Sequence, residues 1–181
     1  MNMKRVLCLL ADGVEETELV APVDILRRAG IEVVMASVAE QRVVRGKHGI
    51  EIGAEVSLAD LETESFDALL LPGGPAVMTL RESGETARLA KEFGDAGKLV
   101  AAICAAPLLL HDAGLLEGKR HTAHSGTYQE LTRAEADQPV VVDGQVITSR
   151  GAGTAVEFGL AVAAHLAGQE KAREVAEAIM V

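Results

Sequence analysis

Short apolar runs alternate along this chain with segments whose apolar residues recur at helical spacing. The apolar runs predict buried strands, and they lie at residues 5–10, 31–37, 67–74 and 98–104, the third of them running into a glycine loop. The segments with helical spacing predict helices, at residues 16–29, 84–96, 105–113, 154–167 and 170–179. Strands that alternate with helices form a mainly parallel sheet with right-handed crossovers. We therefore expect an α/β fold, a doubly wound sheet sandwiched between helices.

Three local patterns interrupt this alternation. Residues 42–45 and 49–56 predict a short hairpin, and residues 140–149 predict a second one around an Asp-Gly dipeptide, which favours tight hairpin turns. Residues 57–61 (SLADL) predict a helical turn that the Ser57 side chain caps. None of these patterns changes the expected fold class.

The first predicted helix has a clear apolar face. Leu19, Val20, Val23 and Leu26 recur at helical spacing, and Gly30 follows at the position where a helix is expected to end. These four apolar positions form the predicted buried side of the helix.

The chain is large enough for a domain with a substantial core. It has 181 residues and no internal repeat, linker or low-complexity segment, so we expect a single domain over residues 1–181. Apolar residues make up 49% of the sequence but aromatic residues only 2%, which predicts an aliphatic core. The apolar stretch from Val6 to Ala11 is too short for a membrane helix or a signal peptide. We therefore expect a soluble, cytoplasmic protein.

Charge and cysteine content exclude several kinds of partner and site. The formal net charge is −10, and the longest basic clusters are pairs such as Arg27-Arg28, so neither nucleic acid nor an anionic membrane is an expected partner. The two cysteines, Cys8 and Cys104, are too far apart for a disulfide framework or a zinc pattern, and no metal site is predicted. Cys8 lies within an apolar run and is predicted to be a small core residue.

Cys104 stands at the junction of a predicted strand and a predicted helix. Small residues lie two positions to either side, Ala102 and Ala106, as the crowded turn beneath a nucleophile requires, and Pro107 suits a first helical turn. A thiol at a helix N-terminus meets the positive end of the helix dipole and free backbone N–H groups, which lower its pKa from about 8.5. The pattern therefore favours a reactive thiolate, with a buried structural cysteine as the alternative.

The loop LPGGP (71–75) also leaves the carboxyl end of a predicted strand, the edge where open parallel sheets bind ligands. Its paired glycines, Gly73 and Gly74, let the backbone approach a ligand closely and expose N–H groups. The N–H groups of Gly74 and Ala105 are predicted to form an oxyanion cradle beside the thiol. An ordinary tight turn after a strand is the alternative.

The acidic loop after the first predicted strand carries Glu15, Glu16 and Glu18. The helix dipole stabilises carboxylates at a helix N-terminus, so solvated capping is the expected role of Glu15 and Glu16. One of the three carboxyls can instead face the thiol, where burial would raise its pKa and suit it to general acid/base work; helical spacing does not say which. Among five histidines, His124 is the candidate imidazole near the thiol and His48 a second one near the cleft, with a surface position as the alternative for both.

The stretch RGAGT (150–154) partly matches a dinucleotide-binding fingerprint. Val156 stands where that fingerprint has its third glycine, and the stretch comes late in the chain. It therefore predicts a turn that opens the next helix, and no nucleotide cofactor is expected.

Four stretches together resemble the ThiJ/PfpI family, and they read ADGVEETELVAPVDILRRAG, LPGGP, AAICAAP and ITSRGAGTAVEF. They are most similar to the branch of the parkinsonism-associated deglycase and its bacterial relatives, and the resemblance runs over nearly the whole chain. It implies a flavodoxin-like α/β sandwich, a homodimer and no cofactor.

The resemblance also implies roles for individual residues. Cys104 matches the family's elbow cysteine, and Glu18 matches the carboxyl that hydrogen-bonds to it. Gly74 and Ala105 match the backbone donors, and His124 matches a histidine near the pocket.

Further positions are implied at the pocket and at an interface. Glu15 and Glu16 belong to the same motif as Glu18, and Gly73 belongs to the glycine loop of the pocket. Asp24 and Arg28 fall in the helix that packs at the dimer interface of this branch.

The chain departs from the family pattern at several positions. Ala106 replaces a glycine common after the elbow, His48 stands where close relatives carry an arginine, and Ala152 replaces a proline that shapes the pocket. These departures bear on substrate preference. Ala105 follows the cysteine where the peptidase-like branch has histidine, so a Cys-His-acid peptidase mechanism is disfavoured.

Two functions follow from the resemblance. In the first, Cys104 attacks a 2-oxoaldehyde such as methylglyoxal, or its adduct with protein, and Glu18 with His124 moves the proton, which gives a glutathione-independent glyoxalase or protein deglycase. In the second, the chain is a redox-responsive stress protein or chaperone whose Cys104 is oxidised to sulfinate. The expected partners are small 2-oxoaldehydes or glycated protein, and a second copy of the chain.

Overall fold

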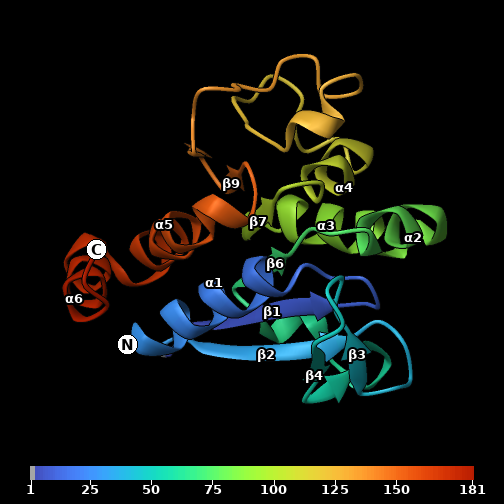
Figure 1. Cartoon of the computed structure of the whole chain (residues 1–181), viewed down its shortest axis with the longest axis horizontal. Helices are drawn as coiled ribbons and strands as arrows, with labels where there is room; N and C mark the ends of the chain where they lie inside the picture. Colours follow the sequence, from blue (N-terminus) through green and yellow to red (C-terminus); the bar gives the residue numbers. More distant parts are fainter. Residues whose placement is uncertain (1–2) are drawn as a thin grey trace.

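The computed structural model describes residues 3–181, which form a seven-stranded sheet covered by helices (Figure 1). The strand order is β5-β2-β1-β6-β7-β9-β8, and every neighbouring pair is parallel except β8 and β9. The strands are β1 (Arg5–Leu10), β2 (Glu32–Ser37), β5 (Val56–Ser57), β6 (Ala68–Leu71), β7 (Leu99–Ile103), β8 (Val140–Asp143) and β9 (Val146–Ser149). A separate hairpin pairs β3 (Val43–Arg45) with β4 (Glu51–Gly53).

The strand order places a topological switch point between β1 and β6. From β1 the chain winds outward through β2 to β5, and it then returns to β6 and winds the other way through β7 to β9. Doubly wound sheets bind ligands beyond the carboxyl ends of their strands at such a point. The order β2-β1-β6-β7-β9 is that of a flavodoxin-like core, which confirms the expected fold class.

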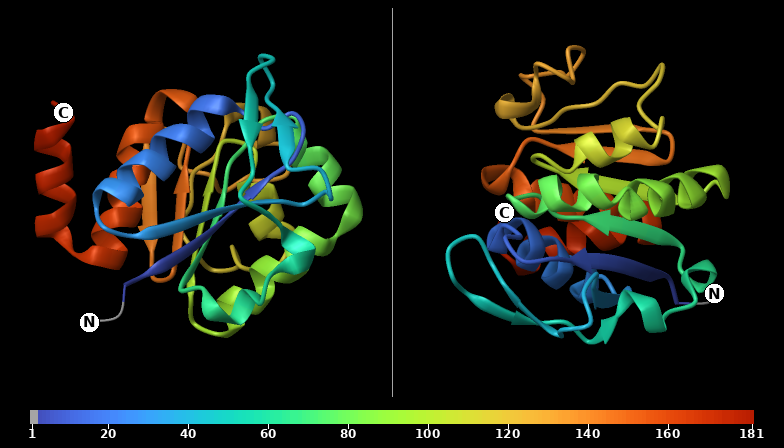
Figure 2. Two further views of the ribbon diagram at one scale, coloured as in Figure 1. Left: turned by 90° about the horizontal axis from the view of Figure 1, so that it is seen from below. Right: turned by 90° about the vertical axis from the view of Figure 1, so that its right-hand side faces the viewer.

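Helices cover both faces of the sheet, and they are α1 (Glu16–Arg28), α2 (Ala76–Ser83), α3 (Glu85–Asp95), α4 (Pro107–Asp112), α5 (Ala155–Ala167) and α6 (Gln169–Ala178). On one face α1 packs against α5, and α6 contacts α5; α2, α3 and α4 contact one another on the other face (Figure 2). No helix within residues 3–181 is long and apolar enough to cross a membrane.

An aliphatic core lies between these layers. The residues of β6 and β7 are all buried, and so are those of β1 after its first residue. Cys8 in β1 has no exposed surface, and burial raises the pKa of its thiol far above the ordinary value. The predictions of an aliphatic core and of Cys8 as a core residue are therefore confirmed.

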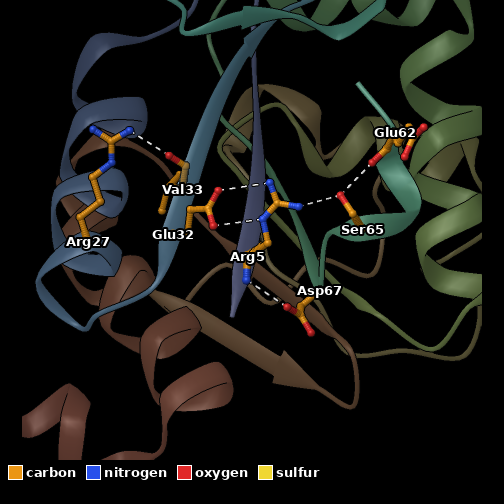
Figure 3. A network of polar contacts seen from close by, with 7 residues as sticks. All are labelled: Arg5, Arg27, Glu32, Val33, Glu62, Ser65 and Asp67. Atoms are coloured by element: carbon orange, nitrogen blue, oxygen red, sulfur yellow. Dashed lines mark hydrogen bonds and ion pairs between the residues drawn. The ribbon is translucent and has the colours of Figure 1, made fainter. Parts of the chain in front are cut away.

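A polar network joins three adjacent strands at their amino ends, opposite the carboxyl edge of the sheet (Figure 3). Arg5 at the start of β1 donates from Nε and Nη2 to the two carboxylate oxygens of Glu32 in β2, at 3.1 and 3.2 Å. Its Nη1 donates to Ser65 Oγ (2.7 Å), and its backbone N–H donates to Asp67 Oδ2 (2.9 Å), just before β6. The network therefore fixes β1 between its two neighbours.

The α2 helix is a difference from the sequence expectations. The pattern places a helix at residues 84–96 but none between the glycine loop and residue 84, whereas α2 occupies Ala76–Ser83 and α3 begins at Glu85. Gly84, with φ +70°, ends the first helix and starts the second. Its left-handed backbone separates the two helices, because few residues other than glycine adopt this conformation.

Two predictions about single side chains are wrong. Ser57 does not cap the turn after it, because it is the last residue of β5, where it pairs with Ser37, and its side chain makes no capping hydrogen bond. Val20 is 53% exposed, because the buried side of α1 runs through Leu19, Val23 and Leu26 and leaves Val20 on the outer side.

Candidate active site

Three loops meet at the carboxyl edge of the sheet, at the switch point between β1 and β6. The loop after β1 leads into α1 with Glu18, the glycine loop with Gly73 follows β6, and Cys104 directly follows β7. The Gly73 N–H donates to Glu18 Oε2 (3.1 Å), and the Glu18 carboxyl shares a hydrogen bond with the Cys104 thiol. The structure therefore brings together the three loops that the sequence predicts at this edge.

Cys104 has a left-handed backbone conformation, with φ +66°, which is uncommon outside glycine. Its N–H donates to the Ser149 carbonyl (2.9 Å), and its own carbonyl accepts from the His124 N–H (2.8 Å). Ala106, two residues on, is fully buried beneath the turn. A strained strand-to-helix turn with small neighbours is typical of a nucleophile elbow, which holds a side chain out of the sheet toward a ligand.

The glycine loop after β6 has no room for side chains. A Cβ atom added to Gly73 would lie 2.4 Å from Glu18 Oε2 and 2.6 Å from Cys104 Cβ. Gly74 has φ +94°, and a Cβ there would lie 2.5 Å from backbone atoms of the loop after β1. Gly73 is required because the backbone there passes directly against Glu18 and Cys104, and Gly74 because it has a left-handed conformation against the loop after β1.

Glu18 is the carboxyl that faces the thiol, which settles the choice among the three glutamates of the acidic loop. Its side chain is 2% exposed, and it contacts the Cys104 thiol and the Gly73 N–H. Burial raises the pKa of the carboxyl to about 7, and the hydrogen bonds from Cys104 and Gly73 only partly offset that rise. A carboxyl that titrates near neutral pH is suited to general acid/base catalysis.

The expectation of a lowered pKa for Cys104 is wrong. Burial, together with the neighbouring Glu18 carboxylate, raises the pKa of the thiol to about 12. The N–H groups of Gly74 and Ala105 hydrogen-bond to the sulfur and lower the pKa, but they do not offset the burial. The sequence shows the helix N-terminus and its donors but not the desolvation. A reactive thiolate in this site therefore needs a nearby group that takes its proton.

His124 lies beside the site and is exposed to solvent. Its Nδ1 accepts from the Gly126 N–H (3.1 Å), so a neutral ring carries its proton on Nε2. The Cδ2 atom, which is bonded to Nε2, lies 3.7 Å from the place that a Cβ on Gly151 would occupy, and Cys104 Sγ lies 3.9 Å from the same place. The imidazole and the thiol therefore border the same small space beside Gly151.

The expectation that Glu15 and Glu16 are solvated is wrong, because both are buried, at 9% and 7% exposure. Glu15 does cap α1, since its Oε2 accepts from the Glu18 N–H (2.9 Å). Glu16 Oε1 instead accepts from the N–H groups of His48 (2.8 Å) and Ile50 (3.4 Å). Glu15 therefore caps α1, whereas Glu16 joins the start of α1 to the loop between β3 and β4.

His48 lies next to Glu15 and Glu16, and it is not among the residues described above as contacting Cys104. One ligand atom of each of the three residues lies within 4.8 Å of the others, a spacing compatible with a metal ion. Backbone N–H groups already bind one oxygen of each carboxyl. Burial disfavours the ionised form of Glu16, but the N–H groups bound to it outweigh this effect and hold its pKa below the usual range. We therefore assign Glu15 to helix capping and Glu16 to loop anchoring.

Two residues of this edge are not in the predicted set. The carbonyl of Ser149, the last residue of β9, accepts a hydrogen bond from the Cys104 N–H, and Gly151 borders the thiol. The signal for both is the stretch ITSRGAGT, because it leaves the carboxyl end of a strand next to β7. Its predicted role as a turn before a helix is confirmed, since a 3₁₀ turn at Ala152–Thr154 leads into α5.

Comparisons with known proteins agree with this geometry. The sequence profile of the DJ-1/PfpI family matches residues 4–165. Protein dj-1beta of Drosophila melanogaster is 40% identical over 182 residues, which cover 98% of this chain and 97% of the relative. Deglycase PfpI of Pyrococcus furiosus is 36% identical over 152 residues, which cover 82% of this chain and 91% of the relative.

Solved structures show the same likeness. The crystal structure of Drosophila melanogaster DJ-1beta superimposes with a TM-score of 0.94 at 39% identity and covers 99% of both chains. The structure of oxidized Toxoplasma gondii DJ-1 superimposes with a TM-score of 0.91 at 33% identity and covers 98% of both chains. Since the likeness extends over the elbow cysteine, the glycine loop and the acidic loop alike, the chain belongs to the DJ-1/PfpI family.

Proposed function

We propose that the chain is a cysteine-dependent, cofactor-free enzyme that converts methylglyoxal to lactate without glutathione and removes methylglyoxal adducts from protein. The observation that carries the proposal is the contact of the Cys104 thiol with the buried Glu18 carboxyl, inside a cradle of backbone N–H groups. Two relatives from Pyrococcus species are named deglycases, which supports the same class of substrate here.

The thiol and the carboxyl activate each other by sharing a proton. Glu18, with a pKa raised to about 7 by burial, is ionised in part at neutral pH. Because the thiol has a pKa of about 12 and does not ionise by itself, Glu18 acts as the base that removes its proton as the sulfur attacks the substrate. The resulting thiolate is held by the N–H groups of Gly74 and Ala105 and by the protonated carboxyl. The pair titrates as a unit, so its apparent pKa values belong to both groups.

The reaction follows from this arrangement. The thiolate attacks the aldehyde carbon, the C–S bond forms, and the carbonyl oxygen takes the proton of Glu18, which gives a hemithioacetal. The Glu18 carboxylate then removes the proton from this carbon and returns it to the neighbouring ketone carbon, while the hydroxyl proton of the hemithioacetal moves to the ketone oxygen, which His124 Nε2–H binds. The thioester that results is hydrolysed by water to lactate and the free thiol. The aldehyde carbon is oxidised and the ketone carbon reduced, so no external oxidant is needed.

Deglycation uses the same steps from a different starting bond. In a hemiaminal adduct of methylglyoxal with protein, the attacked carbon carries the amine beside a hydroxyl, which is the former carbonyl oxygen. The C–S bond forms, the C–N bond breaks, and the amine leaves with a proton from Glu18. The product is the same hemithioacetal.

A redox role is the second candidate function, and the difference in burial between the half-buried Cys104 and the fully buried Cys8 favours it. Two equivalents of peroxide oxidise a thiolate to sulfinate and are reduced to two waters. The cradle that would hold the reaction's oxyanion would also hold the sulfinate oxygens. Mild peroxide should then convert Cys104 to sulfinate and leave Cys8 as a thiol, which mass spectrometry of both peptides measures.

The test of the enzyme is lactate formation from methylglyoxal without glutathione. We expect Cys104→Ser and Glu18→Ala each to lose at least a hundredfold of turnover, because each removes one partner of the proton-sharing pair. Cys8→Ala is the matched control, since it removes the other thiol, and it should keep turnover. A folded, reduced wild-type protein that forms no lactate would contradict the enzyme and favour the redox role. Full turnover in Cys104→Ser would contradict the role of Cys104 as the nucleophile.

We also propose a cytoplasmic homodimer. The resemblance to the family implies the dimer, and the outer side of α1 offers a surface for it. Val20, Asp24 and Arg28 lie four residues apart on that side, where Arg28 donates to Asp24 (2.7 Å) and Val20 is 53% exposed.

A further inference from the structure

Gly151 lies against all three catalytic side chains at once. A Cβ atom added to it would lie 3.7 Å from Glu18 Oε1, 3.7 Å from His124 Cδ2 and 3.9 Å from Cys104 Sγ. These are ordinary van der Waals distances. A space the size of a methyl group is therefore bounded by the nucleophile, the acid/base and the imidazole together.

The backbone does not require glycine at this position. Gly151 has φ 161° and ψ −169°, an extended conformation that any residue adopts. Gly74 is different, because its φ of +94° is strained for a side chain, and a Cβ on Gly73 would collide with Glu18 Oε2 at 2.4 Å. The absence of a side chain at Gly151 therefore calls for a reason other than the fold.

The turn that carries Gly151 is held firmly in place. Its N–H donates to Thr154 Oγ1 (3.3 Å), and its carbonyl accepts both the Thr154 N–H (2.8 Å) and the Thr154 hydroxyl (2.9 Å). The Thr154 hydroxyl is also 2.6 Å from Ser149 Oγ, and Thr154 is buried. A side chain at Gly151 would consequently occupy the space instead of moving away from it.

We propose that Gly151 is a specificity-determining residue whose missing side chain leaves the space for the reacting carbonyl of a small 2-oxoaldehyde. The inference rests on the proposed function and names where its substrate lies. An atom in that space touches Sγ, the carboxyl and the imidazole, as a carbon under attack and proton transfer must. It also lies close to the distance of about 3–3.5 Å from which a nucleophile attacks.

The space further limits the size of the substrate. When the reacting carbonyl carbon of the substrate lies against the Gly151 Cα, the second carbon of the substrate and its substituent extend past the turn. A methyl group at residue 151 would displace this part of methylglyoxal more than that of glyoxal, which has a hydrogen in place of the methyl. One methyl group in a tight pocket changes selectivity by about 10- to 200-fold.

The test compares Gly151→Ala with Gly153→Ala, a substitution in the same turn where an added Cβ meets nothing within 4 Å. We expect Gly151→Ala to lose at least tenfold more kcat/KM for methylglyoxal than for glyoxal, whereas Gly153→Ala keeps both values. The contacts of the new methyl group are ordinary, so both variants should fold, which their melting temperatures check. Equal losses for the two substrates, or none, would overturn the inference.

A second readout does not depend on turnover. Alkylation of Cys104 by iodoacetamide needs the same space beside Sγ, so we expect it to slow at least fivefold in Gly151→Ala and to be unchanged in Gly153→Ala. The alkylation rate of each variant relative to wild type is measured over pH 6–10, which distinguishes a changed thiolate fraction from blocked access to Sγ. If wild type forms no lactate but alkylation is slowed, the proposed function fails while the steric role of Gly151 holds. Unchanged alkylation at every pH would overturn that role.

Discussion

Glu18 is buried beside a thiol, and its partners in the site are the Cys104 Sγ and one backbone N–H. An ionised carboxylate in such a place is poorly solvated, so the fold favours the protonated form. The same property that suits Glu18 to proton transfer near pH 7 therefore lowers the stability of the folded chain once it ionises.

The first prediction concerns the pH dependence of stability in Glu18→Gln. The folded pKa is raised from 4.5 to about 7, so the stabilisation from the protonated carboxyl is complete below pH 4.5 and is lost as the pH rises through 7. At pH 8 the ionised carboxyl costs up to about 3 kcal/mol, and a neutral amide of the same shape avoids that cost. Urea unfolding should therefore show Glu18→Gln to be more stable than wild type at pH 8 and about equal near pH 4.5. A difference of the same size at both pH values would contradict the shifted pKa.

The sequence identifies the chemistry of this site better than its electrostatics. The elbow of Cys104 is visible from small neighbours and a proline, and the resemblance selects Glu18 among three carboxyls. The direction of the Cys104 pKa is not visible, because it depends on how much solvent the folded loops remove from Sγ. The burial of Glu16 is not predicted from the sequence for a similar reason, since the loop that covers this residue lies more than thirty residues further along the chain.

Among the elements, α1 has two tasks, because it carries Glu18 at its first turn and packs against α5 along its length. The close approach of the two helices depends on Gly159 in α5. A Cβ on Gly159 would lie 2.9 Å from Pro22 Cα and 2.9 Å from Ile25 Cδ1. Since backbone and a buried side chain bound the contact, neither yields easily.

The second prediction follows from this contact. Gly159→Ala should lower the free energy of unfolding by about 1–3 kcal/mol, because overpacking between the helices outweighs the better helix propensity of alanine. It should also lower lactate formation, since moving α1 shifts Glu18 relative to Cys104. Thermal unfolding and turnover are measured beside Gly153→Ala, where the added methyl group has open space. Gain of stability in Gly159→Ala would show that α1 and α5 separate without cost.

Elements with a strong pattern are predicted to within a few residues, as β1, α1 and α6 show. The helix α2 is harder to predict, because it is only eight residues long and follows a glycine-rich loop whose sequence predicts irregular structure. Its buried positions, Ala76, Val77 and Leu80, do have helical spacing. Ser57 shows the opposite failure, since a capping residue type lies in a strand when pairing with β2 takes precedence.

At the scale of the whole molecule, the strand order creates the site. Residues 18, 73 and 104 are far apart in the sequence, but β1, β6 and β7 are adjacent and parallel, so their carboxyl ends lie side by side. The Arg5 network at the opposite edge fixes β1 against β2 and the segment before β6. The alternation of strands and helices predicts this sheet, and local pattern predicts the hairpin of β3 and β4. The pairing of β5 with β2 is set by tertiary contacts.

The last prediction concerns assembly. Val20 is 53% exposed on the outer side of α1, an exposure for which the chain itself supplies no partner within residues 3–181. Light scattering should give wild type twice the chain mass of 18.9 kDa. Val20→Glu places a charge in the proposed interface and is compatible with the helix, so it should weaken the dimer at least tenfold without unfolding the monomer.

Met78→Glu is the matched control for this prediction, because Met78 is also 53% exposed and lies on a helix, α2, on the other face of the sheet. It should leave the dimer intact. Dissociation by both variants would point to added charge as the cause, whereas dimers of equal strength in wild type and Val20→Glu would exclude this side of α1. Because Val20 lies two residues from Glu18 in the same helix, a dimer built on α1 would also fix the helix that carries the acid/base, and dilution of wild type below its dissociation constant should then lower turnover per chain.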